Sequence, residues 1–461
     1  MNERRRHRRA PLIVPALLLQ GALCASPARA VAEGAINLEQ ALGIAINASF
    51  ELRAVKARAG ILDLAVRERW RDYFPSLTLS YLQTEERRAR EGDSRQHRIQ
   101  AASEITVYDG GRRGIEYDVA RLEKVLATND YRIGLNRLIM EVSSSFFDLM
   151  RARDEIEIHR ATLEQGRTQL GFITREHDLG EATKLDMLAI RAKVREVELA
   201  LEKAVEDYEA RKNRFKTLLK LDWRTPIEPE GNIERDFAFF PPPPHLNPDY
   251  LVGAALKNRR EAHSADVECL ISARRHLMSC RYYYPKLSLG VNYSLSNDDE
   301  RAVPRERGWG VNFRVSTAFL GSRLSAGAGY SRDNNGNSTA YSGDSSLGVL
   351  DGMSYRRSIA ETASAAGLAA DRKKSVRQQI AAEIAALCAS LNHTWKMIGT
   401  SAERLELYDS FLAIERLKAG MGESRRYDLV KKEIERGEAA IARLDSLIRY
   451  CVTASALESA A

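Results

Sequence analysis

The chain repeats itself, and this duplication constrains its fold more than any other feature. The segment 73–77, Tyr-Phe-Pro-Ser-Leu, recurs 210 residues later at 283–287 as Tyr-Tyr-Pro-Lys-Leu. An alanine-rich, helix-like stretch precedes each copy, and the alternation of apolar and polar residues that is typical of a strand follows it. The sequence therefore predicts two copies of one structural unit.

The correspondence continues further along the chain at an offset of 242 residues. The matched positions are Asp109-Gly110 with Asp351-Gly352, Gly180-Glu181 with Gly422-Glu423, Asp186 with Asp428, Glu196 with Glu438, and Tyr208 with Tyr450. A constant offset over the whole distal half is hard to obtain by chance. The second copy thus carries 32 additional residues between its proline and its Asp-Gly pair.

Each copy has the same order of elements: a helix, a strand region and a very long helical hairpin. In the first structural repeat, 31–236, these occupy 37–72, 75–109 and 112–222, and in the second, 248–461, they occupy 248–281, 285–351 and 354–456. Residues 237–247 contain four consecutive prolines. Because such a run is stiff and cannot lie inside a helix, it is the predicted linker.

The helical hairpins have a narrow apolar seam, which is typical of a coiled coil. The seam residues are Val119, Leu126, Ile133, Met140 and Phe147 on the outgoing arm, and Val197, Leu201, Ala204, Tyr208 and Phe215 on the return arm. The pattern breaks near Gly180. An arm of roughly 65 residues would be about 100 Å long if continuous, which is far beyond any globular domain.

The N-terminus has the pattern of an export signal. Residues 1–9 contain five arginines, an apolar run covers 11–25, and Ala28-Arg29-Ala30 fits a cleavage site, so 1–30 is a predicted signal peptide. Cys24 could instead accept a lipid, but the bulky Leu23 precedes it, and we favour cleavage after Ala30. Almost no later stretch is apolar enough for a membrane-spanning helix.

Charge and motifs argue against two classes of function. The formal charge is +7, but residues 1–30 hold six arginines and one glutamate, so the remainder carries only +2. This leaves no general basic surface for nucleic acid. The eight histidines are scattered, and the motifs of zinc peptidases, phosphate loops and serine hydrolases do not occur. We therefore expect neither an enzyme nor a cofactor.

The strand regions have the pattern of a membrane hairpin. Apolar residues alternate over 77–81 and 99–107 and flank a charged loop at 85–98. Such alternation suits strands with one face toward lipid. A soluble two-stranded hairpin is the alternative, but it is marginally stable alone. Closure of a membrane sheet would need strands from neighbouring subunits.

Taken in this order, the residues resemble the TolC-type outer-membrane efflux family over nearly all of the mature chain. The resemblance rests on the duplicated order of elements, on Tyr-Phe-Pro-x-Leu-x-Leu at the first strand, on Tyr108-Asp109-Gly110-Gly111-Arg112-Arg113 after the second, and on the Gly180 and Gly422 turns, each with Asp six residues later. It implies a mainly α fold with membrane β: long antiparallel coiled-coil hairpins, and a homotrimer in which each protomer gives four strands to a twelve-stranded barrel.

The resemblance also implies a function. The protein would be the exit duct of a tripartite efflux or type I secretion system, conducting passively through the outer membrane and a periplasmic helical tunnel. An inner-membrane pump and a periplasmic adaptor would be its partners, with outer-membrane lipid around the barrel. The alternative is a periplasmic coiled-coil adaptor or scaffold outside the membrane. The duplication argues against it, because adaptors usually have a single hairpin.

The resemblance assigns a gate to the helix tips. Asp428 matches the position where carboxylates line the family's constriction, and three copies would form a ring that favours cations. The family's second acidic position is Lys431 here, which weakens or partly neutralises the ring. The arginine that ties the family's gate shut falls at Ser424, with Arg425 and Arg426 as neighbouring substitutes.

The outer tip and the turns have expected roles as well. Asp186 matches a position that holds the tips together, although a carboxylate at a helix start could instead simply interact with the helix dipole. Gly180 and Gly422 would be the tips that an adaptor grips. Plain hairpin turns are compatible with the same glycines.

Two alternatives remain open in the second repeat. Cys388 and Cys451 lie at similar heights on the hairpin, within about 8 Å along its axis; a disulfide or two buried thiols would fit, and we favour thiols. The additional residues contain three strand-like segments, 308–319, 323–330 and 338–349. They could add a hairpin, giving six strands per protomer and a wider pore, or form a surface loop. We favour the loop because two matched halves give the simpler closure.

Overall fold

The structure of the chain is a computed structural model. It describes residues 34–86, 94–231, 233, 247–297, 306–319, 321–334, 338–349, 354–421 and 426–460. The predicted signal peptide with Cys24, the linker except its last residue, and the Asp351-Gly352 pair lie outside the described residues. The chain divides into two compact units. The first comprises Met1–Ala48, Val142–Asp236 and Tyr408–Leu444, and the second comprises Ser49–Glu141, Phe237–Leu407 and Asp445–Ala461.

The helices of the two repeats have matching lengths, which confirms the internal duplication. The pairs are α1 (Leu38–Ala48) with α6 (Pro248–Asn258), 11 residues each; α2 (Phe50–Arg71) with α7 (Arg260–Cys280), 22 and 21; α3 (Arg112–Asp178) with α8 (Ser354–Gly420), 67 each; and α4 (Lys184–Leu218) with α9 (Arg426–Ala460), 35 each. Their starts differ by 210 residues before the sheet and by 242 after it, as the sequence offsets predict.

The single helix expected at the start of each repeat is wrong, because each is broken into a helix of 11 residues and one of 22 or 21 residues. Ser49 has an extended backbone, and its hydroxyl accepts a hydrogen bond from the Leu52 N–H at 3.2 Å. This is the N-cap arrangement that starts a new helix, α2. At the equivalent position Arg259 is also extended, and its guanidinium pairs with Glu383 of α8 at 2.6 Å. In both repeats a residue with extended backbone therefore ends one helix and begins the next.

The apolar seam of the first hairpin is confirmed on its return arm and only in part on α3. Val197, Ala204 and Phe215 of α4 are buried, whereas the predicted α3 positions are half-buried. For the four α3 positions before Val142 the reason is length, since α4 has 35 residues against 67 in α3. The part of α3 before Val142 packs in the second unit against α2 and α7 instead.

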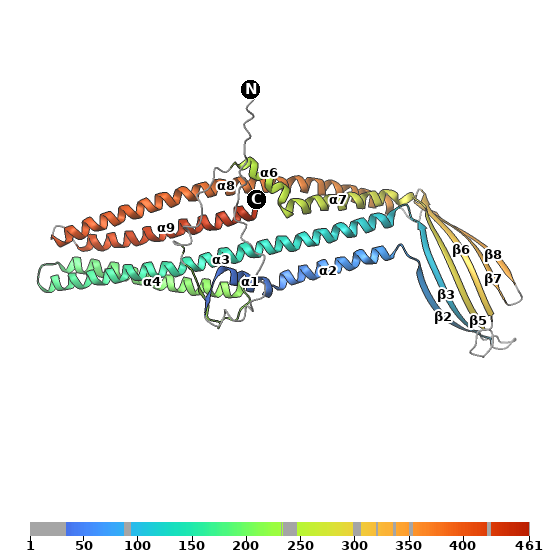
Figure 1. Ribbon diagram of the computed structural model, residues 1–461, viewed down its shortest axis with the longest axis horizontal. Coiled ribbons are helices and arrows are strands. Elements are labelled where there is room, and N and C mark those ends of the chain that lie inside the picture. The colour runs from blue at the N-terminus through green and yellow to red at the C-terminus, as the bar shows by residue number, and fades with distance from the viewer. Residues whose placement is uncertain are drawn as a thin grey trace, which may run out of the picture. The chain divides into compact units, whose positions relative to one another are not determined.

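The strands form a six-stranded antiparallel sheet in the second unit (Figure 1). Its order is β2 (Ser76–Glu86), β3 (Ser94–Tyr108), β5 (Lys286–Asn297), β6 (Glu306–Phe319), β7 (Ser322–Asp333) and β8 (Thr339–Gly348). A short 3-10 helix, Arg281–Tyr283, precedes β5. In the first unit, β1 (Ala35–Ile36) pairs in parallel with β4 (Glu228–Pro229).

The surface loop that we favoured for the additional residues is wrong, because they form the β7–β8 hairpin. Ten residue pairs join β7 to β8, from Arg323 with Gly348 to Arg332 with Thr339. The Asp333 N–H donates to the Ser338 carbonyl at 3.0 Å and closes the hairpin end. A ladder satisfies the backbone groups of this alternating segment, which a loop would leave to solvent. The described residues therefore give this sheet six strands, with β2 and β8 at its edges.

One face of this sheet is apolar and exposed. Leu79 is 72% exposed and Tyr341 is 83% exposed. Aromatic rings form a row across the strands on this face: Trp309 lies opposite Tyr293, its ring centroid is 5.4 Å from that of Tyr330, and Tyr330 is 5.3 Å from Tyr341. The other face carries small and polar residues, among them Gly290, Asn292, Gly310, Asn312 and Asp344. An apolar band bordered by aromatic residues is the pattern of a lipid-facing sheet.

The helices carry no such band. None of the described helices combines the length and apolar character needed to cross a membrane.

The two cysteines of the second hairpin are buried thiols, as we favoured, and no disulfide joins them. Cys388 lies in an apolar cluster of the second unit with Ile384, Leu391 and Tyr450. Burial raises the pKa of the Cys388 thiol. The residue therefore serves as a small apolar side chain in a helical core.

Candidate functional site at the helix tips

The turn between α3 and α4 is built around Gly180. Its φ of +80° lies in the left-handed region that favours glycine. The Glu176 carbonyl accepts hydrogen bonds from the N–H groups of Glu181, at 2.8 Å, and Ala182, at 3.2 Å. These bonds satisfy a carbonyl that the end of α3 would otherwise leave without a partner. Gly180 is therefore a hairpin turn at an exposed tip.

Asp186 takes part in the cap of α4. The Asp186 N–H donates to Thr183 Oγ1 at 3.1 Å, and the Thr183 hydroxyl donates to Asp186 Oδ2 at 2.5 Å. Thr183 is therefore the N-cap of α4, and its hydroxyl is held in place by the Asp186 carboxylate. The local bonding of Asp186 thus matches the helix-start alternative that the sequence left open.

Arg426 ties the first residue of α9 to the end of α3. Its Nε donates to Glu176 Oε1 at 2.5 Å, and Nη1 donates to Gln169 Oε1 at 3.4 Å. The guanidinium carbon also lies 5.0 Å from the ring centroid of Phe172. The Arg426 and Glu176 side chains are partly buried, at 25% and 28% exposure. A charge-assisted contact of this kind joins the tip of one hairpin to the tip of the other.

An apolar cluster lies beside this ion pair and holds the same helices together. Its buried members are Leu163, Ile173, Ile190, Val194, Val197 and Val430, with Tyr427 and Ile434 among the residues packed against it. Gly437 permits a close approach, because a Cβ there would lie 2.8 Å from Thr162 Oγ1 of α3. The α9 face that carries Tyr427 and Val430 is therefore fixed against the α3–α4 hairpin.

Asp428 and Lys431 lie on the opposite side of α9 and are exposed. They are three residues apart, so their side chains are neighbours on the helix surface. The structure thus separates the predicted gate residues into two groups: Arg426 faces the neighbouring hairpin, and Asp428 with Lys431 faces outward. Arg425 and Gly422 lie outside the described residues.

Sequence reasoning missed Glu433, a buried carboxylate in this region. Its side chain is 3% exposed, and Oε1 lies 3.6 Å from Arg416 Nη2 of α8. The other oxygen, Oε2, is buried and has no hydrogen-bond partner among the described residues. Burial raises the pKa of this carboxyl, and the Arg416 charge opposes the rise. Its position three residues after buried Val430 could have revealed it as a residue of the packed face.

Part of the chain matches a known protein family. Residues 41–219 match the family described as "Outer membrane efflux protein". No curated protein matches the chain.

Solved structures share the fold over nearly the whole chain. The Campylobacter jejuni CmeC outer membrane channel is 12% identical, with 92% of this chain and 85% of that chain covered and a TM-score of 0.75. The Neisseria gonorrhoeae MtrE outer membrane channel, in its open state, is 13% identical, with 92% and 88% covered and a TM-score of 0.73. The Vibrio cholerae outer membrane protein VceC is 15% identical, with 92% and 94% covered and a TM-score of 0.71.

Proposed function

We propose, on the premise that this chain belongs to the outer membrane efflux protein family, that it forms a homotrimeric outer-membrane channel. Its helices would lie in the periplasm and form a tunnel with a gate at the tips. It would serve as the exit duct of a tripartite efflux or type I secretion system, in which an inner-membrane pump supplies the energy. The family and the fold are those of channels rather than enzymes.

The six-stranded sheet is the observation that carries this proposal. Its exposed apolar face suits lipid, yet β2 and β8 each have one edge that pairs with none of the described strands. In a bilayer, unpaired backbone groups cost several kcal/mol each, so a membrane sheet has to close. Because the number of strands is even, β8 of one copy runs antiparallel to β2 of the next. Three copies of a six-stranded sheet would give eighteen strands in all.

An eighteen-stranded barrel would be wider than the twelve-stranded barrel that the resemblance implied. Barrel diameter grows with strand number, and barrels of 16–18 strands leave an aqueous channel. The face opposite the apolar one is polar: glycine, serine and asparagine predominate on β5 to β7, and Arg98, Glu104 and Arg314 lie among them. We therefore infer an open, polar pore in the membrane, with the constriction elsewhere.

The helix tips are the proposed gate. The pairing of Arg426 with Glu176 would hold α9 against α3 in the closed state. Three exposed copies of Asp428 would surround the axis, with Lys431 partly neutralising them. Arg425 would assist Arg426, and Asp186 would act through the start of α4. The turns at Gly180 and Gly422 are the proposed contacts for an adaptor.

The rival function is a periplasmic scaffold that never enters the membrane. The sheet argues against it, because a soluble protein rarely leaves a contiguous apolar face and two strand edges exposed.

Planar-bilayer recording on the detergent-purified full chain tests the proposal. We expect discrete trimer-sized conductance events that prefer cations, and a reduced cation preference in Asp428→Ala. Arg426→Ala should raise the open fraction, since it removes the contact with Glu176. The matched control is Glu438→Ala, an exposed carboxylate elsewhere on α9. Channel events that neither gate variant changes would move the gate elsewhere. The absence of events from folded, reconstituted protein would favour the scaffold.

A further inference from the structure

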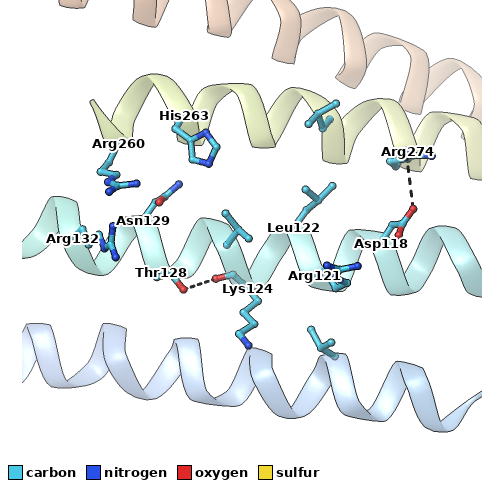
Figure 2. A pocket seen from close by; sticks show the side chains of 13 residues that line it. Asp118, Arg121, Leu122, Lys124, Thr128, Asn129, Arg132, Arg260, His263 and Arg274 are labelled. Carbon is cyan, nitrogen blue, oxygen red and sulfur yellow. Dashed lines mark hydrogen bonds and ion pairs between the residues drawn. The ribbon is translucent and has the colours of Figure 1, made fainter. Parts of the chain in front are cut away.

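A groove in the second unit lies along three neighbouring helices, α2, α3 and α7. Ion pairs fix their order: Lys124 of α3 contacts Asp63 of α2 at 2.6 Å, and Arg275 of α7 contacts Glu123 of α3 at 2.5 Å. The groove has a volume of about 680 Å³, which is in the range of sites for small molecules. Figure 2 shows α3 in the middle, with polar side chains from α3 and α7 lining the groove.

The lining of this groove has an excess of positive charge. Five cationic side chains line it, Arg121, Lys124, Arg132, Arg260 and Arg274, against one carboxylate, Asp118. Asp118 lies 3.9 Å from Arg274, and Lys124 pairs with Asp63. Arg132 and Arg260 have no ion-pair partner in the described part of the chain. At least two guanidinium groups thus remain available to an anion.

Asn129 adds an unmet hydrogen-bond donor to the same groove. Its side chain is 4% exposed, and its Nδ2 has no hydrogen-bond partner among the described residues. In Figure 2 its amide lies between α3 and α7, near His263 and Arg260. Leaving a buried donor unsatisfied costs about 1–3 kcal/mol, which a bound acceptor would recover. A donor and two guanidinium groups therefore converge on one space.

A second groove on the same helices provides a comparison. It lies on the opposite side of α3, where Glu123 and Asp130 line it, and residues of α2, α7 and α8 complete its lining. Its charges balance, with three arginines, Arg58, Arg275 and Arg372, against three carboxylates, Glu123, Asp130 and Glu268. Four of these six charges form two ion pairs across helices, Arg275 with Glu123 and Arg372 with Glu268. The positive excess is therefore specific to one side of the helix layer.

We propose that the groove lined by Asn129, Arg132 and Arg260 is a binding site for a small anion that carries phosphate or carboxylate groups. The guanidinium groups bind the anionic oxygens, and the Asn129 amide donates to one of them. The same chemistry is found in free solutes and in anionic lipid headgroups. The site stands independently of the channel function, because binding needs only the folded helices.

Isothermal titration of the full chain in phosphatidylcholine nanodiscs with pyrophosphate tests the proposal. We expect saturable binding that weakens as salt is added. The double variant Arg132→Gln, Arg260→Gln should weaken it at least about tenfold, which corresponds to 1.4 kcal/mol. The matched control is Arg58→Gln, Arg372→Gln on the opposite groove, which should leave affinity unchanged. Thermal unfolding verifies that each variant is folded.

A second variant and a second nanodisc separate the remaining outcomes. Asn129→Asp places a carboxylate in the groove and should abolish binding, while Asn129→Ala should weaken it by several-fold. If nanodiscs containing phosphatidylglycerol reduce pyrophosphate binding to the wild type but not to the double variant, the ligand source is a lipid headgroup. If they do not, it is a free solute. No saturable binding to folded wild type, or an equal loss in the control, would overturn the site.

Discussion

The two repeats agree in their helices and differ in their strands. Paired helices match in length to within one residue, whereas the first repeat supplies two strands to the six-stranded sheet and the second supplies four. A helix that packs lengthwise against neighbours cannot change length without losing contacts along its side. A sheet edge can accept a whole hairpin, because two added strands preserve the alternation of direction that closure requires. The duplicated unit has thus been elaborated only where the geometry tolerates it.

The helical cores agree at equivalent positions while using different side chains. Val142 and Ile384, which are 242 residues apart, are both fully buried. Phe146 packs against Phe215 with ring centroids 6.0 Å apart, and the equivalent positions, Cys388 and Leu457, belong to one cluster of the second unit. The smaller pair is accompanied there by the ring of Trp395, 5.2 Å from Tyr450. The burial pattern has been kept while the volumes were redistributed.

The largest expected effect is loss of the trimer when β8, one of the two additional strands of the second repeat, is disrupted. Ser345→Pro and Ser346→Pro in β8 each remove one ladder donor, and adjacent strand residues point their N–H groups to opposite sides. One variant therefore disturbs β7 and the other the neighbouring protomer, and in lipid each loss costs several kcal/mol. We expect both to lose the trimer in size-exclusion chromatography with light scattering.

The control for these variants is Ser345→Thr, which keeps the N–H and should stay trimeric. A trimer that survives both prolines would place β8 away from the subunit interface.

Cavities in the two helical cores should lower the free energy of unfolding by different amounts. Ile384→Ala should destabilise the protein by about 2–5 kcal/mol. Val142→Ala removes one methylene fewer, so we expect a cost smaller by about 0.8 kcal/mol. Thermal unfolding of the two variants side by side measures the difference. Equal midpoints would mean that the second core collapses around its cavity better than the first.

Two helical glycines of the second repeat should respond in opposite directions. Gly437→Ala places a Cβ 2.8 Å from Thr162 Oγ1, so we expect destabilisation by about 1 kcal/mol or more. Gly367→Ala meets nothing within 4 Å and should stabilise α8 by about 0.5–1 kcal/mol. Unfolding midpoints that move in the same direction would contradict the close contact of α9 with α3.

The smallest expected effect is a dependence of stability on pH. The first repeat has exposed Arg191 where the second has buried Glu433. Because burial raises the pKa of Glu433, its contribution to stability is present below the ordinary pKa of 4.5 and is lost as pH rises through the raised value. Glu433→Gln should therefore be more stable than the wild type at pH 8, with the gap shrinking toward pH 4.

Glu435→Gln serves as the control for pH, because Glu435 is half-buried on the same helix and pairs with Lys432 at 2.8 Å. A gap between Glu433→Gln and wild type that stays constant with pH would show that Glu433 is not the titrating group.

The sequence predicted the long helices well and the strand number poorly. Helical starts followed from the two offsets, since periodic apolar positions and glycine turns such as Gly180 are local signals. The breaks at Ser49 and Arg259 were missed, because a single capping serine or an extended arginine interrupts an otherwise helical pattern. The β7–β8 hairpin was not predicted, although its apolar and polar residues alternate, because two repeats with equal numbers of strands gave the simpler closure of the barrel. At the tips, the partner of Arg426 was beyond prediction, since Glu176 is 250 residues away.

The central claim is that three copies close one barrel with six strands from each. Electron cryo-microscopy of the full chain in lipid nanodiscs tests it most directly. We expect a threefold particle with eighteen membrane strands, in which β8 of each protomer pairs with β2 of the next. A barrel of twelve strands with the β7–β8 hairpin outside it, or a particle without a closed barrel, would show that the six-stranded sheets do not close in this way.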